Sequence, residues 1–355
     1  MGTFGTYGAE IRALHPGDDL DAQIDLAERA FGIRPPAVRE SWRRELSVLI
    51  AAGRCFGAFA GGRPAGAARF HDMRQWWHGR AVPMAGIGGV AVAPEDRGRG
   101  IGRQLVTSVL AEVAARGYPL SVLYPATMPL YRSLGWELAG ARYSAVIPGR
   151  SLRSLASPDA AVAPPGARVV SAETLASAGG SPGGAGPAFR RAGPGDAEAV
   201  NSVIGRVHEA ARDCGPITWD ADAVRRSLAD QGTYHYICDD GYLAYHWRNE
   251  NDEIFVQRAY GLSPATVRAL WALVASHTSV AGTVRACVGP ADPFWWLTRE
   301  PDAGLSVSYM WMFRVVDAPA AIAARGFPPL GHAGAGGPIP HPPLAAACPR
   351  SPSSV

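Results

Sequence analysis

A basic, glycine-rich turn separates an apolar strand from an amphipathic helix in the first third of this chain. Residues 90–92, Val-Ala-Val, are typical of a buried strand, and residues 97–103 have the sequence Arg-Gly-Arg-Gly-Ile-Gly-Arg. The helix follows at once, because Leu105, Val109 and Val113 recur at helical spacing. Glycines let backbone amides approach a ligand closely, and the N-terminus of a helix favours an anion. The order of these elements therefore predicts a cradle for a diphosphate.

The details of this turn exclude two other phosphate-binding motifs. The turn does not end in the Gly-Lys-Ser/Thr of a P-loop, and a G-x-G-x-x-G with a ribose-binding acid is also missing. The pattern that is present is Arg97-x-x-Gly100-x-Gly102 directly after an apolar strand. It resembles the pyrophosphate loop of the GNAT acyltransferase superfamily. The plain alternative is a basic turn that only caps the helix.

Two further segments carry the resemblance. Residues 128–137, Met-Pro-Leu-Tyr-Arg-Ser-Leu-Gly-Trp-Glu, resemble a segment of GNAT proteins in which a tyrosine precedes a Gly-aromatic pair. The spacing between the glycine-rich turn and Tyr131, together with the sequence of residues 308–327, resembles that of the Eis (enhanced intracellular survival) acetyltransferases. Those proteins join two GNAT-type domains to a sterol-carrier-like domain, and the resemblance covers roughly residues 8–327.

The expected fold class is α/β (α+β), with tandem GNAT folds that each form a mixed, mostly antiparallel sheet flanked by helices. A truncated C-terminal segment would follow them. Residues 328–355 contain eight prolines, so this tail cannot bury enough apolar surface to offset its ordering entropy. The expected division is a catalytic GNAT domain at 1–148, a Ser/Ala/Gly/Pro-rich connector at 149–188, a degenerate GNAT-like domain at 189–303, the start of a sterol-carrier-like domain at 304–327 and a disordered tail at 328–355.

Composition narrows the functional classes. The chain has 355 residues, 47% of them hydrophobic, and a formal net charge of only +3, so a nucleic-acid partner is not expected. Its five cysteines are widely spaced and include no CxxC pair, so neither a metal site nor a disulfide framework is expected. Residues 1–25 contain acids and no long apolar run, so we expect neither a leader nor a membrane-spanning segment. We therefore expect a cytoplasmic enzyme without a membrane partner; a homo-oligomer is left open.

The resemblance implies that acetyl-CoA is the cosubstrate and lies between residues 90–92 and the strand at residues 120–124. A bulge at Gly88 and Gly89 would help to part these strands. The backbone amide near Val92 would then donate to the thioester carbonyl as negative charge develops on it. The residues expected to bind the cosubstrate are Val90, Ala91, Val92, Arg97, Gly98, Arg99, Gly100, Ile101, Gly102 and Arg103.

Tyr131 matches the general-acid tyrosine of the family, and a phenol can protonate a departing thiolate of similar basicity. The alternative is an aromatic side chain that only packs. Cys55 is a weaker candidate for a nucleophile, because no base stands next to it in the sequence. In the Eis family the C-terminal carboxylate takes the amine proton, but here an unrelated tail replaces that terminus. The substitutes are His71, Asp72, His78 and Glu137, or an amine that arrives already neutral.

Trp42 matches an aromatic that lines the acceptor pocket of the family, and Phe31 and Trp76 are expected to add to that wall. An equally plain alternative is that these aromatic residues anchor the core. Arg34 replaces the acid that helps the family to hold polycationic aminoglycosides. The expected activity is therefore N-acetylation of a primary amine of a small molecule or peptide, by direct attack in a ternary complex. The alternatives are transfer of a longer acyl group to an amino-sugar or antibiotic amine, and a non-catalytic CoA-binding remnant.

Overall fold

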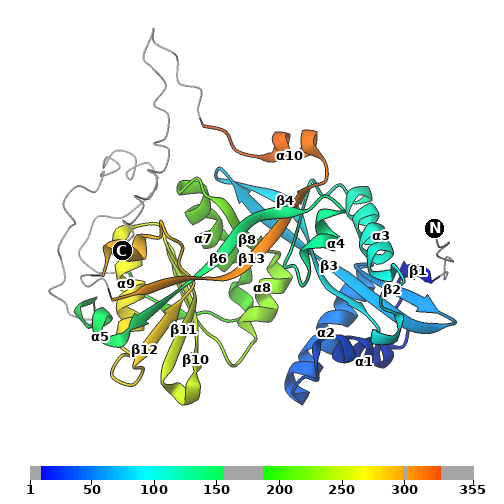
Figure 1. Ribbon diagram of the computed structural model, residues 1–355. Helices are drawn as coiled ribbons and strands as arrows, with labels where there is room; N and C mark the ends of the chain where they lie inside the picture. The colour runs from blue at the N-terminus through cyan, green and yellow to red at the C-terminus, as the bar shows by residue number, and fades with distance from the viewer. Residues whose placement is uncertain (1–8, 156–186, 299–301, 329–355) are drawn as a thin grey trace, which may run out of the picture.

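One continuous sheet passes through both halves of the protein in the computed structural model, which describes residues 9–155, 187–298 and 302–328 (Figure 1). The first unit contributes β1 (Glu10–Ala13), β2 (Cys55–Ala60), β3 (Arg63–Trp77), β4 (Arg80–Val92), β5 (Leu120–Leu123) and β6 (Glu137–Pro148). The second unit contributes β7 (Arg190–Arg191), β8 (Cys214–Trp219), β9 (Tyr234–Cys238), β10 (Gly241–Arg248), β11 (Glu253–Gly261) and β12 (Thr283–Ala286). The strand order is β1-β2-β3-β4-β5-β13-β6-β12-β11-β10-β9-β7, where β13 spans Gly304–Val315, and β8 pairs with β3.

Helices cover both faces of this sheet. They are α1 (Leu20–Phe31), α2 (Pro36–Ala51), α3 (Ile101–Ala115), α4 (Met128–Arg132), α5 (Gly149–Leu152), α7 (Ala197–Ala210), α8 (Ala221–Leu228), α9 (Pro264–Ala275) and α10 (Ala318–Ala324). One core lies between α3 and the alternate residues Ala85, Ile87 and Leu123. The residues between these positions, such as Met84 and Val122, pack toward α10 on the opposite face. This alternation gives the sheet two buried faces over much of the first unit, as expected for the α/β class.

The two units interlock through shared strands. β6 pairs with β13 and, near its end, with β12 of the second unit. β13 follows the second unit in sequence but lies between β5 and β6 of the first unit, antiparallel to both. This segment was expected to open a sterol-carrier-like domain, whereas its strand belongs to the shared sheet. The chain therefore leaves the first unit and returns to complete it.

The expected connector begins later than predicted. Residues 149–155 form α5 and a short 3₁₀ turn, and Leu152 and Leu155 are buried in the core of the second unit. Burial of these two leucines explains why the segment is helical in spite of its polar neighbours. The rest of the connector, residues 156–186, and the tail from residue 329 onward lie outside the described residues.

Candidate active site

Strands β4 and β5 part at the place where the sequence predicted a notch. The two strands run parallel and are paired from Met84–Leu120 to Ile87–Leu123. β4 then continues to Val92, paired with β3 on its other edge. A β-bulge marks the parting, because the pairing register shifts between Arg69 and Ala67, and Gly89 has a φ of +59°. The predicted bulge is confirmed, and it exposes one edge of β4.

The amide of Val92 points toward that exposed edge. The N–H of Ala93 donates to the carbonyl oxygen of Ala65 at 2.9 Å, on the β3 side. Successive backbone amides of an extended strand point to opposite edges. The N–H of Val92 is therefore directed away from β3, into the space from which β5 has departed.

The glycine-rich turn leads directly into the uncapped N-terminus of α3. Gly98 and Gly100 have φ values of +77° and +79°, a conformation that other residues rarely adopt. The helix begins at Ile101 without a side-chain cap among the described residues. The amides of its first turn are therefore available to an anion, with the helix dipole adding to the attraction.

The buried side chain of Asp96 anchors the glycine-rich turn through hydrogen bonds. Its side chain is 0% exposed and accepts two hydrogen bonds from Arg63, at 2.6 and 3.0 Å. Arg99 donates a third bond at 2.9 Å. The bonds from Arg63 keep the pKa of Asp96 below its usual range, so the carboxylate stays ionised at neutral pH. Arg97 and Arg103 remain exposed around the turn.

Tyr131 lies on α4, which packs beside the start of α3. A Cβ added at Gly102 would lie 3.5 Å from Cγ2 of Val92 and 3.9 Å from Cδ2 of Leu130. The end of β4, the start of α3 and α4 therefore meet at Gly102. Tyr131 is only 6% exposed, and burial raises the pKa of its phenol. Its hydroxyl has no hydrogen-bond partner within the described parts of the chain, so it is free to donate to a ligand.

The predicted acceptor aromatics are not all brought together. Trp42 is 8% exposed, and with Arg69 and Gly89 it lines one small cavity next to the bulge. The guanidinium of Arg34 lies 4.3 Å from the centre of its ring, and that of Arg69 lies 5.6 Å away. Phe31 is 52% exposed at the end of α1. Trp42 thus lies beside the bulge of β4, between two positive charges.

Trp76 does not lie beside Trp42. It lies opposite Ala81, ten residues along β3 from the pair Gly66–Val92, which corresponds to about 30 Å of strand. Its ring packs 5.4 Å from that of His208 on α7. The length of β3 therefore carries the side chain of Trp76 away from Trp42, to the boundary with the second unit.

None of the candidate bases is well suited to take the amine proton. His71 stands closest to the bulge, since its Nε2 lies 4.0 Å from a Cβ added at Gly88. Burial lowers the pKa of His71 to about 4, which makes it a weak base. Glu137 is paired with Arg132, which lowers its pKa, and Asp72 receives a hydrogen bond from Arg54.

His78 lies in the turn that follows β3, next to the end of the strand that carries Trp76 and far from the bulge. Cys55 is buried, and desolvation raises the pKa of its thiol to about 12, so it is not a ready nucleophile.

The corresponding helix of the second unit carries its own cap. The hydroxyl of Ser263 accepts a hydrogen bond from the amide of Thr266 at 3.1 Å, at the N-terminus of α9. The carboxylate of Asp240 accepts bonds from the hydroxyls of both residues, at 3.2 and 2.6 Å. A negative charge therefore stands where a pyrophosphate would have to bind. This arrangement agrees with the expectation that only the first unit holds CoA.

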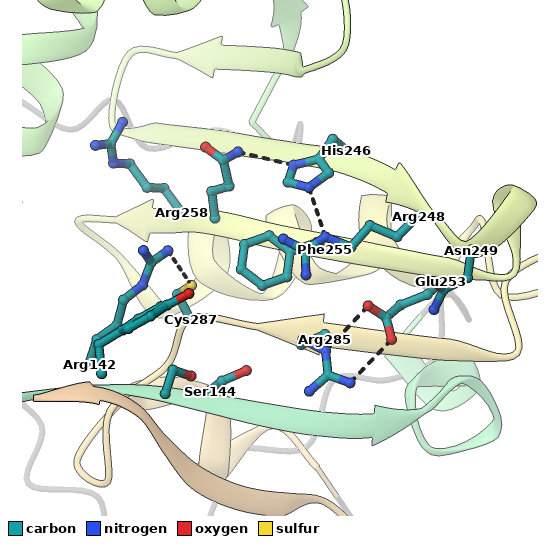
Figure 2. Close-up of a pocket in the computed structure, with 13 residues that line it drawn as sticks. Arg142, Ser144, His246, Arg248, Asn249, Glu253, Phe255, Arg258, Arg285 and Cys287 are labelled. Carbon is teal, nitrogen blue, oxygen red and sulfur yellow. Dashed lines mark hydrogen bonds and ion pairs between the residues drawn. The ribbon is translucent and has the colours of Figure 1, made fainter. Parts of the chain in front are cut away.

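A large basic pocket, which we call the basic basin, lies where strands of the second unit meet β6 and β13, and the sequence did not lead us to predict it (Figure 2). It has a volume of about 720 Å³. Polar residues of β10, β11 and β12 that alternate with buried apolar ones form its floor. The alternation of polar and apolar residues along these strands was a sequence signal that could have revealed a polar face of the sheet. The lining residues are Arg142, Ser144, His246, Arg248, Asn249, Glu253, Phe255, Gln257, Arg258, Arg285, Cys287, Ser308 and Tyr309.

Two negative findings concern the described residues alone. They contain no group of three or more His, Cys, Asp or Glu side chains that could hold a metal ion. They also contain no helix that is both long and apolar enough to span a bilayer.

Comparison with known proteins agrees with this geometry. Residues 10–139 and residues 215–315 each match a family model described as an acetyltransferase (GNAT) domain. The solved structure of a GCN5-related N-acetyltransferase from Kribbella flavida is 37% identical, with a TM-score of 0.78, over 91% of this chain and 75% of that one. N-acetyltransferase Eis of Mycobacterium tuberculosis is 26% identical over 321 residues, which are 87% of this chain and 75% of that protein.

The chain therefore belongs to the GCN5-related N-acetyltransferase (GNAT) family. Its two GNAT domains and its match to Eis along most of its length make it an acetyltransferase of the Eis type. Mycothiol acetyltransferase of Thermobispora bispora is 32% identical, but over only 142 residues, so the chain spans about half the length of that relative, 46%. The predicted family and fold class are confirmed.

Proposed function

We propose that the first unit transfers the acetyl group of acetyl-CoA directly to a primary amine of a small molecule or peptide, in a ternary complex. The observation that carries this proposal is the parting of β4 from β5 after Ile87, beside the uncapped start of α3. Acetyl-CoA is a cytoplasmic metabolite, so the proposal also places the reaction in the cytoplasm.

The first unit has groups that could bind the pyrophosphate, the pantetheine arm and the thioester of acetyl-CoA. The amides of residues 97–103 would hold the pyrophosphate, with Arg97 and Arg103 adding positive charge. The backbone of residues 90–92 would pair with the pantetheine arm along the free edge of β4. The amide of Val92 would then donate to the thioester oxygen as it gains charge, an effect often worth roughly 3 to 4 kcal/mol in acyl transfer.

Tyr131 would supply the proton that the leaving group needs. The amine nitrogen attacks the thioester carbonyl carbon, a C–N bond forms and the C–S bond breaks. The sulfur leaves as a thiolate and takes the phenolic proton of Tyr131, which the surplus proton of the amine later restores through water. The unpaired hydroxyl of Tyr131 supports this role, because no other residue within the described parts of the chain engages its proton.

The acceptor would enter past Trp42. Arg34 and Arg69 flank this ring, so a polycationic acceptor would meet repulsion at the point where its amine must lie. We therefore propose acceptors that are neutral or anionic apart from the reacting amine.

The test is release of CoA from acetyl-CoA with a panel of primary amines, alongside direct titration of acetyl-CoA binding. Turnover with at least one amine, and stable N-acetyl product by mass spectrometry, supports the proposal. Binding of acetyl-CoA without turnover of any amine would favour the non-catalytic remnant. Faster reaction with butyryl-CoA or longer thioesters would favour the longer-acyl alternative.

A further inference from the structure

The basic basin lies on the same face of the shared sheet as the acceptor side of the cleft. On β12, Val284 and Ala286 face the core beneath α9, whereas Arg285 and the residue that follows the strand, Cys287, face the basin. On β6, Ala145 faces the same core, and Arg142 and Ser144 face the basin. The basin therefore opens on the face opposite α9. The pairing of β6 with β13 carries this face into the first unit.

Tyr124 connects the basin with the cleft. It directly follows Leu123, the last residue of β5 that is paired with β4. Its ring lies 5.8 Å from that of Tyr309, which lines the basin. A ligand that extends from the cleft along β5 and β13 would therefore pass Tyr124 and reach the basin.

Positive charge dominates the basin. Four arginines line it, Arg142, Arg248, Arg258 and Arg285, against one carboxylate, Glu253 (Figure 2). That carboxylate is already engaged, because it accepts bonds from Arg285 at 3.3 and 3.4 Å. His246 adds no compensating negative charge in either protonation state.

Two of the four guanidinium groups, those of Arg142 and Arg248, are held in place by neutral partners. Arg248 stacks on Phe255, 3.8 Å from the ring centre, and donates to Nε2 of His246 at 3.0 Å. Arg142 donates to the sulfur of Cys287 at 2.8 Å. Neutral partners leave the charge uncompensated, and arginine's planar fork suits a carboxylate or phosphate.

We propose that the basic basin binds an anionic group of the acceptor, so that preferred substrates are primary amines carrying a carboxylate or phosphate some distance from the reacting nitrogen. This inference rests on the proposed function. It assigns a role to the second unit, whose own helix N-terminus is closed to CoA. The arginines of the basin would position the acceptor, and the cleft would perform the chemistry.

The experiment compares ω-amino carboxylates of increasing chain length with unbranched alkylamines of equal length. CoA release gives kcat/KM for each member of both series. The test variant is the double substitution Arg142→Gln and Arg258→Gln, and the double substitution to Lys keeps the charge. Arg268→Gln is the matched control, because Arg268 lies on α9, on the opposite face of the sheet.

We expect an optimal chain length at which the amino acid exceeds the alkylamine at least tenfold in kcat/KM, about 1.4 kcal/mol. The Gln variant should reduce that ratio to near one, the Lys variant should retain much of it, and Arg268→Gln should leave it unchanged. Equal use of both series at every length, or a ratio unaffected by the Gln variant, would overturn the inference while leaving the proposed function intact.

A direct binding measurement keeps the inference testable if no amine is acetylated, which would count against the proposed function. Calorimetric titration with 6-aminohexanoate and with inorganic pyrophosphate, in the presence of acetyl-CoA, separates the two sources of anion. Binding of the amino acid that the Gln variant loses supports the inference. Binding of neither probe, or binding that the Gln variant retains, contradicts it.

Discussion

Arg103 at the start of α3 donates from Nη2 to the hydroxyl of Ser133 at 2.6 Å, across the space between the glycine-rich turn and α4. Ser133 in turn donates to the carbonyl oxygen of Leu130 at 2.6 Å, which fixes the turn that follows Tyr131. Ser133→Ala should therefore lower kcat about three- to tenfold by loosening Tyr131, a loss of the size expected for one hydrogen bond. The Kd for acetyl-CoA, measured by titration, should change less than kcat does.

Tyr131→Phe should lower kcat by about 10² to 10⁴, because it removes the proton donor without removing the ring that packs in the core. The Kd for acetyl-CoA should remain close to that of the wild type. Tyr118→Phe is a suitable control, since Tyr118 packs on Phe70 near the other end of β5. An unchanged kcat in Tyr131→Phe would show that the tyrosine only packs.

Much of this site was visible in the sequence because its signals are local. The positive φ of Gly61 and Gly62, the bulge at Gly89 and the start of α3 depend on residues next to one another. The hairpin of β9 and β10 is equally local, because its two strands follow one another closely in the sequence. Local patterns fix elements, but they do not say which distant strands pair.

The unpredicted features all depend on long-range pairing. β13 enters the first unit from the end of the chain, and most of its residues are exposed, so it has no alternation to reveal its place. β8 joins the outer part of β3, which sets the boundary where Trp76 packs. The basic basin arises where β10, β11 and β12 come together with β6 and β13. The sequence of each strand alone shows only that one of its faces is polar.

Arg34→Glu should shift the acceptor preference toward polycationic amines. The substitution replaces a positive charge beside Trp42 with a negative one, close to the point where the amine must lie. We expect kcat/KM for an aminoglycoside such as kanamycin to rise about tenfold relative to a neutral amine, corresponding to about 1.4 kcal/mol. Arg44→Glu, on the exposed side of α2, should leave the ratio unchanged. If the two variants gave the same ratio, Arg34 would not lie at the acceptor site.

The burial of His71 makes stability depend on pH. Its pKa in the folded protein is about 4, below the ordinary value of 6.5, so the unfolded chain binds a proton first as the pH falls. The free energy of unfolding should therefore decrease between pH 6.5 and pH 4, by at most about 3 kcal/mol from this residue.

Asp292 acts in the opposite sense over part of that range, because burial raises its pKa to about 6. The measurement is therefore urea unfolding of the wild type and His71→Gln at several pH values. The difference in unfolding free energy between the two proteins should shrink as the pH falls from 6.5 to 4. A difference that is constant with pH would show that His71 does not cause the loss of stability.

Binding of acetyl-CoA to the glycine-rich turn of the first unit is the claim on which the mechanism depends. Calorimetric titration tests it most directly, with Gly100→Glu and Gly100→Gln as a matched pair, because both strain a residue with a φ of +79° and only one adds a charge. We predict one molecule of acetyl-CoA per chain, far weaker binding in Gly100→Glu than in Gly100→Gln, and unchanged binding in Ser263→Ala. Equal affinities in the two Gly100 variants, or a loss of binding in Ser263→Ala, would place the cosubstrate elsewhere.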